Sequence, residues 1–380
     1  MKQERLGAYF HIPFCDTKCV YCDFYSITNH SQSEKFYQAI EKEIHLFFES
    51  YQPDKNLTSI FFGGGTPSLA KPEDLGRLIK TLGSYCTIEQ DSENTLEANP
   101  GTLTPEKLSG LLDAGFNRIS MGVQSFFEDD LKFLARIHSA ETAKNAVIEA
   151  SQQGFRNISI DLIFGLPDQT MNRWKKNLED AVRLPISHIS CYNLIVEEHT
   201  PLFGYVETGK VNVLGDEANE ELYEFTIDFL KQEGFRQYEV SNFARPGMES
   251  LHNSTYWSFD PYFAFGPSAH GFIDGKRFQN VKSLTTYLEK LNRNERPTVS
   301  AENVSGHQLI NEKLMLSVRT TEGTAIEDIW TLLDENKKQN LTTELSRLQT
   351  EGLIIWTEKR IQPTEKGIRF ADSIAEQLFI

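Results

Sequence analysis

The stretch Leu111–Ser120 reads Leu-Leu-Asp-Ala-Gly-Phe-Asn-Arg-Ile-Ser, and the same design returns at 150–159 and at 229–238. Each copy begins as a helix, reaches a glycine followed by phenylalanine, and continues into residues that favour a strand. The glycines of successive copies lie 39 and 80 residues apart. These spacings correspond to one and two helix–strand units, so the joints predict a modular α/β domain.

Strand-like runs occur along the whole first part of the chain. We predict strands over Gly7–Ile12, Thr58–Phe62, Asn94–Ala98, Arg118–Val123, Asn157–Phe164, His188–Val196 and Arg236–Asn242. Most of these runs are separated by helix-like sequence, and strands that alternate with helices form a parallel sheet. If this sheet closes into a whole or partial barrel, ligands are expected at the carboxyl ends of its strands.

The rhythm of helices and strands breaks after about residue 245. We therefore predict a barrel, a connecting segment rich in aromatic residues, glycine and proline, and a helical, winged-helix-like C-terminal domain, over residues 1–245, 246–300 and 301–380. In the last part Glu344 and Glu351 offset Arg347, so the helix before the wing has no basic face for DNA. We interpret this domain as a substrate lid or a docking module.

Composition limits the classes of function. The chain has 380 residues, with 38 basic and 54 acidic side chains and a formal net charge of −16, so we expect no nucleic-acid partner. No apolar run approaches the roughly 18 residues of a membrane span, and no signal peptide is visible. We expect a cytoplasmic protein without an intrinsic membrane anchor. Five cysteines, three of them within eight residues, favour a metal site in a reducing compartment over disulfides.

The cysteine cluster follows the first predicted strand as Cys15-x3-Cys19-x2-Cys22. Three thiolates can bind zinc if a fourth ligand closes the site, and His11 or His30 could supply it. Three thiolates can also hold a four-iron cluster and leave one iron open to a ligand that is not protein. Paired disulfides are the least favoured alternative.

Several residues at the ends of predicted strands suggest a ligand site. The run 61–68 contains three glycines before Thr66, which let the backbone approach a ligand but also suit an ordinary tight turn. Glu97, Gln124 and Asp161 come late in apolar strands, where a carboxylate needs a partner. That partner could be a bound ligand, or Arg118 or Arg136 in a buried ion pair.

Together these motifs resemble the radical S-adenosylmethionine (SAM) superfamily. The run 9–15 (Tyr-Phe-His-Ile-Pro-Phe-Cys), the Gly-Gly-Gly-Thr-Pro-Ser turn and the run 161–170 are similar to its oxygen-independent coproporphyrinogen III oxidase group. The resemblance implies a partial (β/α)6 TIM-like barrel, a [4Fe-4S] cluster on Cys15, Cys19 and Cys22, and SAM on the open iron. It implies SAM contacts from Tyr9, Tyr21, Gly64, Gly65, Thr66, Glu97, Gln124, Arg136, Asp161 and Ile195.

Within that group the sequence departs from the decarboxylases. Phe24 stands where they carry a further cysteine, and only fourteen residues precede Cys15. These departures resemble the haem chaperone branch, which carries haem to respiratory enzymes. The run 251–257 matches that branch's His-Asn-x-x-Tyr-Trp signature, so the resemblance implies that His252 contributes to haem binding. From the residues alone, an aromatic hinge with His252 hydrogen-bonded in place is the alternative, and His270 is a second candidate ligand.

We therefore weigh three functions. The preferred one is a carrier that takes haem as cargo to acceptor haemoproteins, with SAM and the cluster as cofactors, an electron donor as a further partner, and a homodimer left open. The second is an enzyme that oxidatively decarboxylates coproporphyrinogen III, against which Phe24 and the short N-terminal arm count. The third, modification of tRNA or protein by a related radical enzyme, is disfavoured because the acidic charge supplies no broad phosphate-binding surface.

Overall fold

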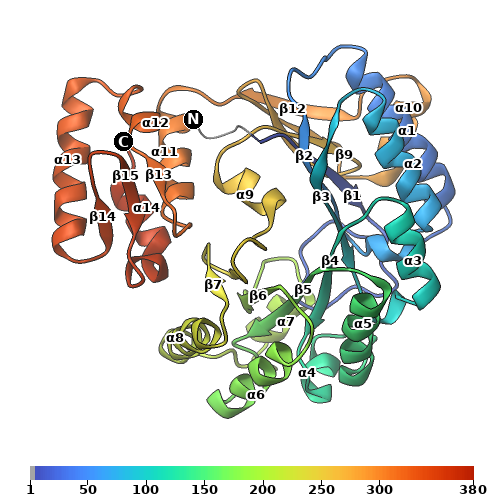
Figure 1. Ribbon diagram of the computed structural model, residues 1–380, viewed down its shortest axis with the longest axis horizontal. Coiled ribbons are helices and arrows are strands. Elements are labelled where there is room, and N and C mark those ends of the chain that lie inside the picture. The colour runs from blue at the N-terminus through green and yellow to red at the C-terminus, as the bar shows by residue number, and fades with distance from the viewer. Residues whose placement is uncertain (1–4) are drawn as a thin grey trace.

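The computed structural model describes residues 5–380. Figure 1 shows an arc of strands with helices around its outside and a separate group of helices and short strands where the arc is open. Six neighbouring strands of the arc are parallel and confirm the predicted α/β barrel. They are β1 (Gly7–Ile12), β2 (Leu57–Gly64), β3 (Ile88–Ala98), β4 (Arg118–Gln124), β5 (Asn157–Phe164) and β6 (His188–Asn193). Because the sheet does not close on itself, the barrel is partial.

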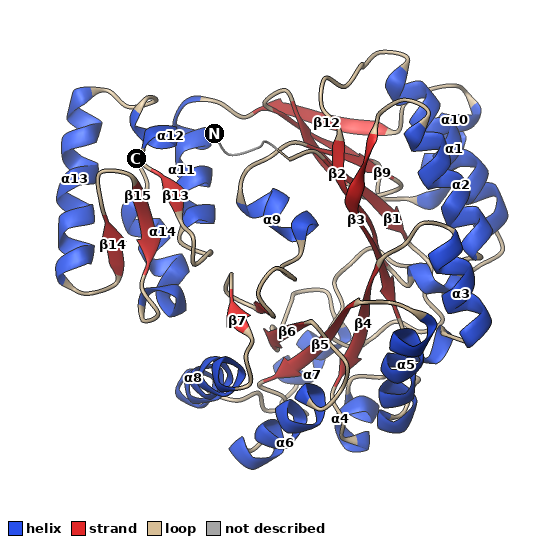
Figure 2. Cartoon of the chain, viewed as in Figure 1, coloured by secondary structure: helices blue, strands red, loops and turns tan. Residues whose placement is uncertain are grey.

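Helices follow the parallel strands and cover their outer face, as Figure 2 shows. They are α1 (Ser33–Phe48), α2 (Pro72–Gly83), α3 (Pro105–Asp113), α4 (Glu128–Phe133), α5 (Ala140–Gln153), α6 (Met171–Val182), α7 (Pro201–Glu207) and α8 (Asp216–Gln232). The repeated joints end α3, α5 and α8 as predicted. In each, the phenylalanine N–H donates to a carbonyl five residues back, at 3.0, 3.1 and 2.9 Å, and the glycine before it has a positive φ.

The strands divide their side chains by simple alternation. On β1, Ala8, Phe10 and Ile12 face outward and are at most 1% exposed, within the large apolar core between sheet and helices. The alternate residues of each strand face the barrel interior, and many of them are polar or glycine. Packing between helices and strands therefore stabilises the barrel, while its inner surface is free to carry polar groups.

The predicted strand over Arg236–Asn242 is wrong. The structure splits it into β7 (Arg236–Gln237) and β8 (Asn242–Ala244), which pair antiparallel with each other, and β8 is antiparallel to β6. The chain turns back here because the Tyr238 N–H donates to the Asn242 carbonyl and the Tyr223 hydroxyl donates to the Val240 carbonyl. The apolar pattern of 236–242 thus belongs to a tight hairpin.

The segment predicted only as a connection also contributes to the sheet. The strands β9 (Tyr262–Phe265), β10 (His270–Ile273), β11 (Lys276–Asn280) and β12 (Thr298–Asn303) extend it beyond β1, with α10 (Leu284–Asn292) packed on α1. Here β9 pairs parallel with β1, and β10 to β12 follow as an antiparallel meander. Buried Glu43 of α1 links this extension to the barrel, because it accepts hydrogen bonds from Gly266 N, Asn280 Nδ2 and Tyr287 Oη.

The helix α9 (Leu251–Trp257) lies on the concave side of the sheet. Glu93 of β3 accepts hydrogen bonds from the Ser250 hydroxyl and from the backbone N–H groups of Leu251 and His252, at 3.1 to 3.2 Å. These bonds satisfy donors that the first turn of a helix leaves unpaired. Ser59 lies in the amino half of β2, and its partner Glu93 precedes the part of β3 that pairs with β4, so α9 closes the amino end of the barrel.

The C-terminal elements form a second small core with a three-stranded sheet, in an order that fits a winged helix. They are α11 (Gly306–Ser317), β13 (Thr324–Ala325), α12 (Glu327–Trp330), α13 (Glu335–Thr350), β14 (Ile354–Trp356), β15 (Arg360–Pro363) and α14 (Ala371–Leu378). This unit contacts the barrel beside the β7–β8 hairpin, where the Val240 N–H donates to the Arg319 carbonyl at 3.0 Å. Within residues 5–380, none of the helices is long and apolar enough to cross a bilayer.

Candidate functional site

A cavity of about 420 Å³ opens at the carboxyl ends of the parallel strands, which is where a barrel fold places its ligands. Most residues that the sequence nominates line it. These are Cys15, Cys19, Cys22, Tyr21, Gly64, Gly65, Thr66, Glu97, Gln124, Arg136, Asp161 and Ile195. They come from segments up to 180 residues apart, so the topology of the sheet brings them together.

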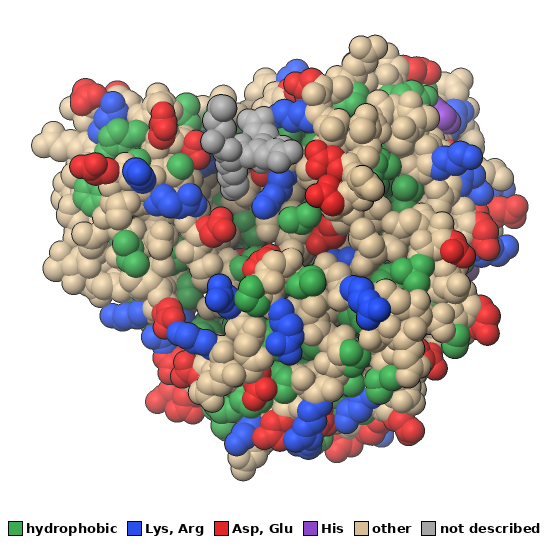
Figure 3. Space-filling view, in the orientation of Figure 1, with side chains coloured by type: hydrophobic (Ala, Val, Ile, Leu, Met, Phe, Trp, Pro, Cys, Tyr) green, Lys and Arg blue, Asp and Glu red, His purple; other side chains and the backbone are tan. Residues whose placement is uncertain are grey.

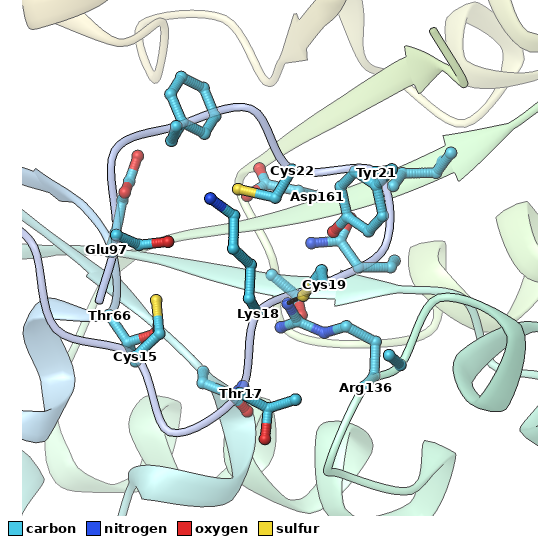
Figure 4. A pocket seen from close by; sticks show the side chains of 18 of the residues that line it. Cys15, Thr17, Lys18, Cys19, Tyr21, Cys22, Thr66, Glu97, Arg136 and Asp161 are labelled. Carbon is cyan, nitrogen blue, oxygen red and sulfur yellow. Dashed lines mark hydrogen bonds between the residues drawn. The ribbon is translucent and has the colours of Figure 1, made fainter. Parts of the chain in front are cut away.

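The three cysteines lie on the loop that follows β1. Figure 4 shows their sulfur atoms around one part of the cavity, with the Lys18 side chain extending between them in this view. The base of the loop is fixed by hydrogen bonds from Cys15 N to Ile27 O and from Ile27 N to Pro13 O, at 3.0 and 2.7 Å. All three thiols are free, and a part of the surface of each is exposed.

Two neighbours donate hydrogen bonds to the sulfur atoms. The Thr66 hydroxyl lies 3.4 Å from Cys15 Sγ, and Arg136 Nη1 lies 3.2 Å from Cys19 Sγ. Burial raises the pKa of Cys15, and it raises the pKa of Cys22 to about 11, so these two thiols hold their protons at neutral pH when nothing is bound. A metal that binds them must displace these protons, and Arg136 then supplies a positive charge beside the resulting thiolates.

The donor set fits an iron–sulfur cluster better than a single zinc ion. Within the described part of the chain, no three His, Cys, Asp or Glu side chains surround a point where one metal ion would sit. A four-iron cluster places each thiolate on a different iron, so its ligands need not converge on one point. His11, which could have closed a zinc site, contacts the Tyr9 hydroxyl and the Tyr25 carbonyl with its two ring nitrogens instead.

The glycine turn after β2 forms one wall of the cavity and requires glycine for two reasons. Gly64 has a φ of +105°, and a Cβ there would lie 2.5 Å from the His11 ring. A Cβ on Gly65 would lie 2.7 Å from the Phe14 carbonyl oxygen, directly behind Cys15. The turn therefore packs tightly on the cysteine loop and leaves its own backbone bare toward the cavity.

Glu97 and Asp161 bring two carboxylates into the cavity from β3 and β5. Glu97 Oε2 accepts a hydrogen bond from Gly64 N at 3.1 Å, and Asp161 Oδ1 accepts one from the Ser120 hydroxyl at 3.4 Å. Burial, reinforced by the nearby Asp161, raises the pKa of Glu97 to about 7, and burial also raises the pKa of Asp161. Arg118, one of the partners considered above, pairs instead with Glu93 at 3.7 Å. The two carboxylates thus face the cavity with capacity to accept further hydrogen bonds.

Gln124 and Arg136 complete this side of the site. Gln124 ends β4 with a φ of +69°, and the pairing of β4 with β5 shifts register just before it. A non-glycine residue in this conformation is strained, and such strain is concentrated at functional sites. Arg136 Nη2 donates to the Gly122 carbonyl at 2.8 Å, while its buried Nε has no partner within residues 5–380. A bound acceptor would satisfy that nitrogen.

Tyr9 and His252 lie outside the lining of this cavity. Their rings stack at 6.4 Å, and Phe61 lies 5.0 Å from His252. His252 is 1% exposed, and its ring nitrogens contact the Ser59 and Tyr256 hydroxyls at 3.0 and 2.8 Å. In this arrangement no lone pair of His252 is accessible to an iron, because α9 is packed into the barrel. The structure thus has the hydrogen-bonded arrangement that the sequence left as the alternative to haem ligation.

Sequence reasoning missed several residues that line the cavity, among them Lys18, Ser120, Gly122, Tyr192 and Asn193. Ser120 and Gly122 precede Gln124 by four and two residues on β4, so the period of a strand places them on the same face. The alternation of side chains along β4 could therefore have identified Ser120 and Gly122 from the sequence. Tyr192 has the same relation to the interior residues of β6, whereas Lys18 lies within the cysteine loop and has no periodic signal.

Comparisons with known proteins agree with this geometry. Residues 9–181 match the radical SAM superfamily, and residues 304–370 match the HemN C-terminal domain. The heme chaperone HemW of Lactococcus lactis is 34% identical over 100% of this chain and 99% of its own, and that of Bacillus subtilis is 37% identical over 95% and 96%. A zebrafish (Danio rerio) relative, the mitochondrial radical S-adenosyl methionine domain-containing protein 1, is 33% identical over 98% of this chain and 86% of its own.

Among solved structures, coproporphyrinogen III oxidase HemN from Escherichia coli, a radical SAM enzyme, superposes with a TM-score of 0.85 at 25% identity. The match covers 99% of this chain and 90% of that one. The likeness therefore extends through the C-terminal unit as well as the barrel. Membership of this superfamily implies SAM and a [4Fe-4S] cluster, which the cysteine loop and the cavity described above fit. With full-length identity above 30% to several relatives, the chain belongs to the HemW family of radical SAM proteins.

Proposed function

We propose that this protein is a haem chaperone that binds haem and delivers it to acceptor haemoproteins such as respiratory enzymes. The observation that carries the proposal is the identity of 34 to 37% to proteins named heme chaperone HemW over at least 95% of this chain. The exposed phenylalanine Phe24, at the position of the decarboxylases' further cysteine, supports the same choice.

In this proposal Cys15, Cys19 and Cys22 hold a [4Fe-4S] cluster whose fourth iron binds SAM. When bound, the cluster and SAM supply the one-electron chemistry of the superfamily. Glu97 and Asp161 accept hydrogen bonds from the hydroxyl or ammonium groups of SAM, and the bare backbone of Gly64 and Gly65 allows close approach. The further SAM contacts are Tyr9, Tyr21, Thr66, Gln124, Arg136 and Ile195. Tyr9 lies outside the cavity lining and would contribute through its neighbour Glu97. Burial raises the pKa of the Tyr9 phenol, and the nearby Glu97 carboxylate raises it further.

The test is a haem titration of the anaerobically reconstituted full chain, followed by difference absorbance in the Soret region. A chaperone gives a saturable change, and bound haem then transfers to an apo-haemoprotein added in excess. Absence of a saturable change would exclude the proposal. Iron and sulfide per chain, measured on the same sample, establish whether the cluster is present.

The second candidate function is oxidative decarboxylation of coproporphyrinogen III, and the TM-score of 0.85 to HemN is the observation that favours it. An anaerobic assay with SAM, a reductant and coproporphyrinogen III separates the two. Formation of protoporphyrinogen would make the protein an enzyme of porphyrin synthesis. SAM cleavage without that product would point to a different radical substrate.

The proposal carries further expectations about the setting. The free thiols of the cysteine loop suit a reducing compartment, so we place the protein in the cytoplasm. The cluster needs an electron donor if it is to be reduced. A homodimer would be compatible with delivery, and light scattering with and without haem tests it.

A further inference from the structure

The mouth of the cavity carries four large apolar side chains that face solvent. Phe24 is 64% exposed, Ile137 53%, Tyr192 41% and Ile195 63%. All four line the same cavity, although they come from the cysteine loop, the segment after α4, and the end of β6 with the loop that follows it. We call these four residues the apolar rim. Exposed large apolar groups that cluster around one opening mark a binding surface.

Ile195 is both a member of the apolar rim and a nominated SAM contact, so the rim begins at the edge of the SAM site, and Phe24 and Ile137 lie among the cavity residues that are not nominated for SAM. The predicted polar contacts, Glu97, Gln124 and Asp161, lie deeper in the barrel on the strands themselves. A cavity of about 420 Å³ is at the small end of the range for ligand pockets. SAM would therefore fill the cavity as far as Ile195 and leave the outer part of the apolar rim uncovered, so the rim has room for a second, flatter and more apolar ligand.

Resting on the proposed function, we propose that the apolar rim is the docking site of the haem cargo, with one face of the porphyrin on Phe24, Ile137, Tyr192 and Ile195. A porphyrin is a broad apolar plane, and burial of apolar surface supplies the main attraction. The other face remains open, which suits a carrier because an acceptor protein can then approach the haem.

The charges at the mouth suggest how the haem is oriented. Lys18 is exposed, lines the cavity and forms no salt bridge with another residue in the described range 5–380. It can pair with a haem propionate. Asp16, Asp23 and Glu197 also line the mouth and would repel the propionates. The carboxylate edge of the haem is therefore directed away from the loop that carries Glu197, and on the cysteine loop Lys18 is the group that can pair with a propionate, between Asp16 and Asp23.

His199 is the axial ligand that the structure favours. Of the nine histidines, all but His199 and His270 have a ring nitrogen in a hydrogen bond within the described residues. His199 is exposed and lies on the loop after β6, four residues beyond Ile195 and two beyond Glu197, both of which line the mouth. Neither histidine is among the residues that line the cavity, but His270 begins β10, whereas His199 shares a loop with Ile195 of the apolar rim. An accessible imidazole beside the rim suits haem iron.

The experiment is a haem titration of the full reconstituted chain and of matched variants. Phe24→Ser with Ile137→Ser removes half of the rim and touches none of the nominated SAM contacts. The control pairs Phe379→Ser with Ile355→Ser, which are 47% and 46% exposed and lie in the C-terminal unit. We expect the rim variant to raise the haem Kd at least about tenfold and the control to change it less than about twofold.

The ligand is tested by His199→Ala and His270→Ala. We expect His199→Ala to shift the Soret maximum of bound ferric haem and His270→Ala to leave it unchanged. Equal haem affinity in the rim variant and its control would overturn the docking site. A Soret shift in His270→Ala or His252→Ala but not in His199→Ala would overturn the ligand. Failure of the unmodified chain to bind haem would instead remove the proposed function itself.

Discussion

A glutamate lies inside each end of the barrel, and the two glutamates have opposite surroundings. Glu93 and Glu97 lie four residues apart on β3, and both side chains point to the interior. At the amino end, Glu93 is 5% exposed, accepts three hydrogen bonds from the start of α9 and pairs with Arg118. At the carboxyl end, Glu97 accepts a hydrogen bond from Gly64 N and faces the cavity.

The difference shows which polar groups serve the fold and which are available to a ligand. A buried carboxylate is tolerated when hydrogen bonds and a counter-charge satisfy it, as they do for Glu93. Glu97 accepts one hydrogen bond, and burial together with the nearby Asp161 raises its pKa. The amino end of the barrel is therefore a closed structural plug, and the carboxyl end is a site prepared for a bound molecule.

The largest expected effect concerns the open end. Cys15→Ala should abolish cluster assembly, because two thiolates cannot hold a four-iron cluster of this kind. Iron and sulfide per chain after anaerobic reconstitution measure it. Cys86→Ala is the matched control, since Cys86 is buried far along the chain from the loop and should leave iron content unchanged. Full iron in Cys15→Ala, or zinc in the unmodified chain, would contradict the assignment.

The next effect compares the two glutamates directly. At pH 8, Glu93→Gln should lower the free energy of unfolding by about 3 to 5 kcal/mol, because it leaves buried Arg118 without its counter-charge. Glu97→Gln should not lower it, since it removes a carboxylate that burial disfavours. Denaturant unfolding without SAM measures both. Equal losses in the two variants would show that the ends of the barrel do not differ as described.

The pH dependence of Glu97→Gln sharpens the same comparison. The folded pKa of Glu97, about 7, lies above its ordinary value of 4.5. Its contribution to stability is therefore fully present below about pH 4.5 and is lost as pH rises through about 7. Between pH 5 and 8 the stability of the variant should rise relative to the unmodified chain by about 1 to 3 kcal/mol, allowing for the partial exposure of the side chain to the cavity. A difference that does not vary with pH would contradict the raised pKa.

The smallest effect concerns the plug. His252→Ala should lower the free energy of unfolding by about 1 to 3 kcal/mol, because the Ser59 and Tyr256 hydroxyls lose their partner. We expect its Soret spectrum with haem to match that of the unmodified chain. His188→Ala is a suitable comparison, since His188 is also buried with both ring nitrogens hydrogen-bonded, to Ser159 and Tyr238. A lost or shifted Soret band in His252→Ala alone would return His252 to the role of haem ligand.

The sequence predicted the parts of the fold that depend on local patterns. The glycine–phenylalanine joints and the apolar alternation identify the parallel strands, and β1 and β5 have the predicted bounds. The cavity also followed, because parallel strands bring their carboxyl ends together. The hairpin of β7 and β8 did not, since its turn depends on the Tyr223 hydroxyl from another element.

Longer-range partnerships were beyond local reasoning. Strand β9 pairs with β1 across more than 250 residues of chain, and β10 to β12 join the sheet only through β9, so nothing in their own sequence marks them as part of the barrel sheet. In the same way, the sequence of the His-Asn-x-x-Tyr-Trp run does not show that Ser59 and Glu93 will form hydrogen bonds with it. The structure explains why a motif with the chemistry of a metal ligand can serve as a plug.

The position of α9 between β8 and β9 has a consequence for the size of the barrel. Through this helix the chain passes from β8, beside β6, to β9, beside β1. His252 of α9 is hydrogen-bonded to Ser59 of β2, and Ser250, which caps the helix, is hydrogen-bonded to Glu93 of β3. The seven residues of α9 therefore help to set the distance between the two ends of the open sheet. A small shift of residues 251–257 would widen or narrow the opening of the barrel.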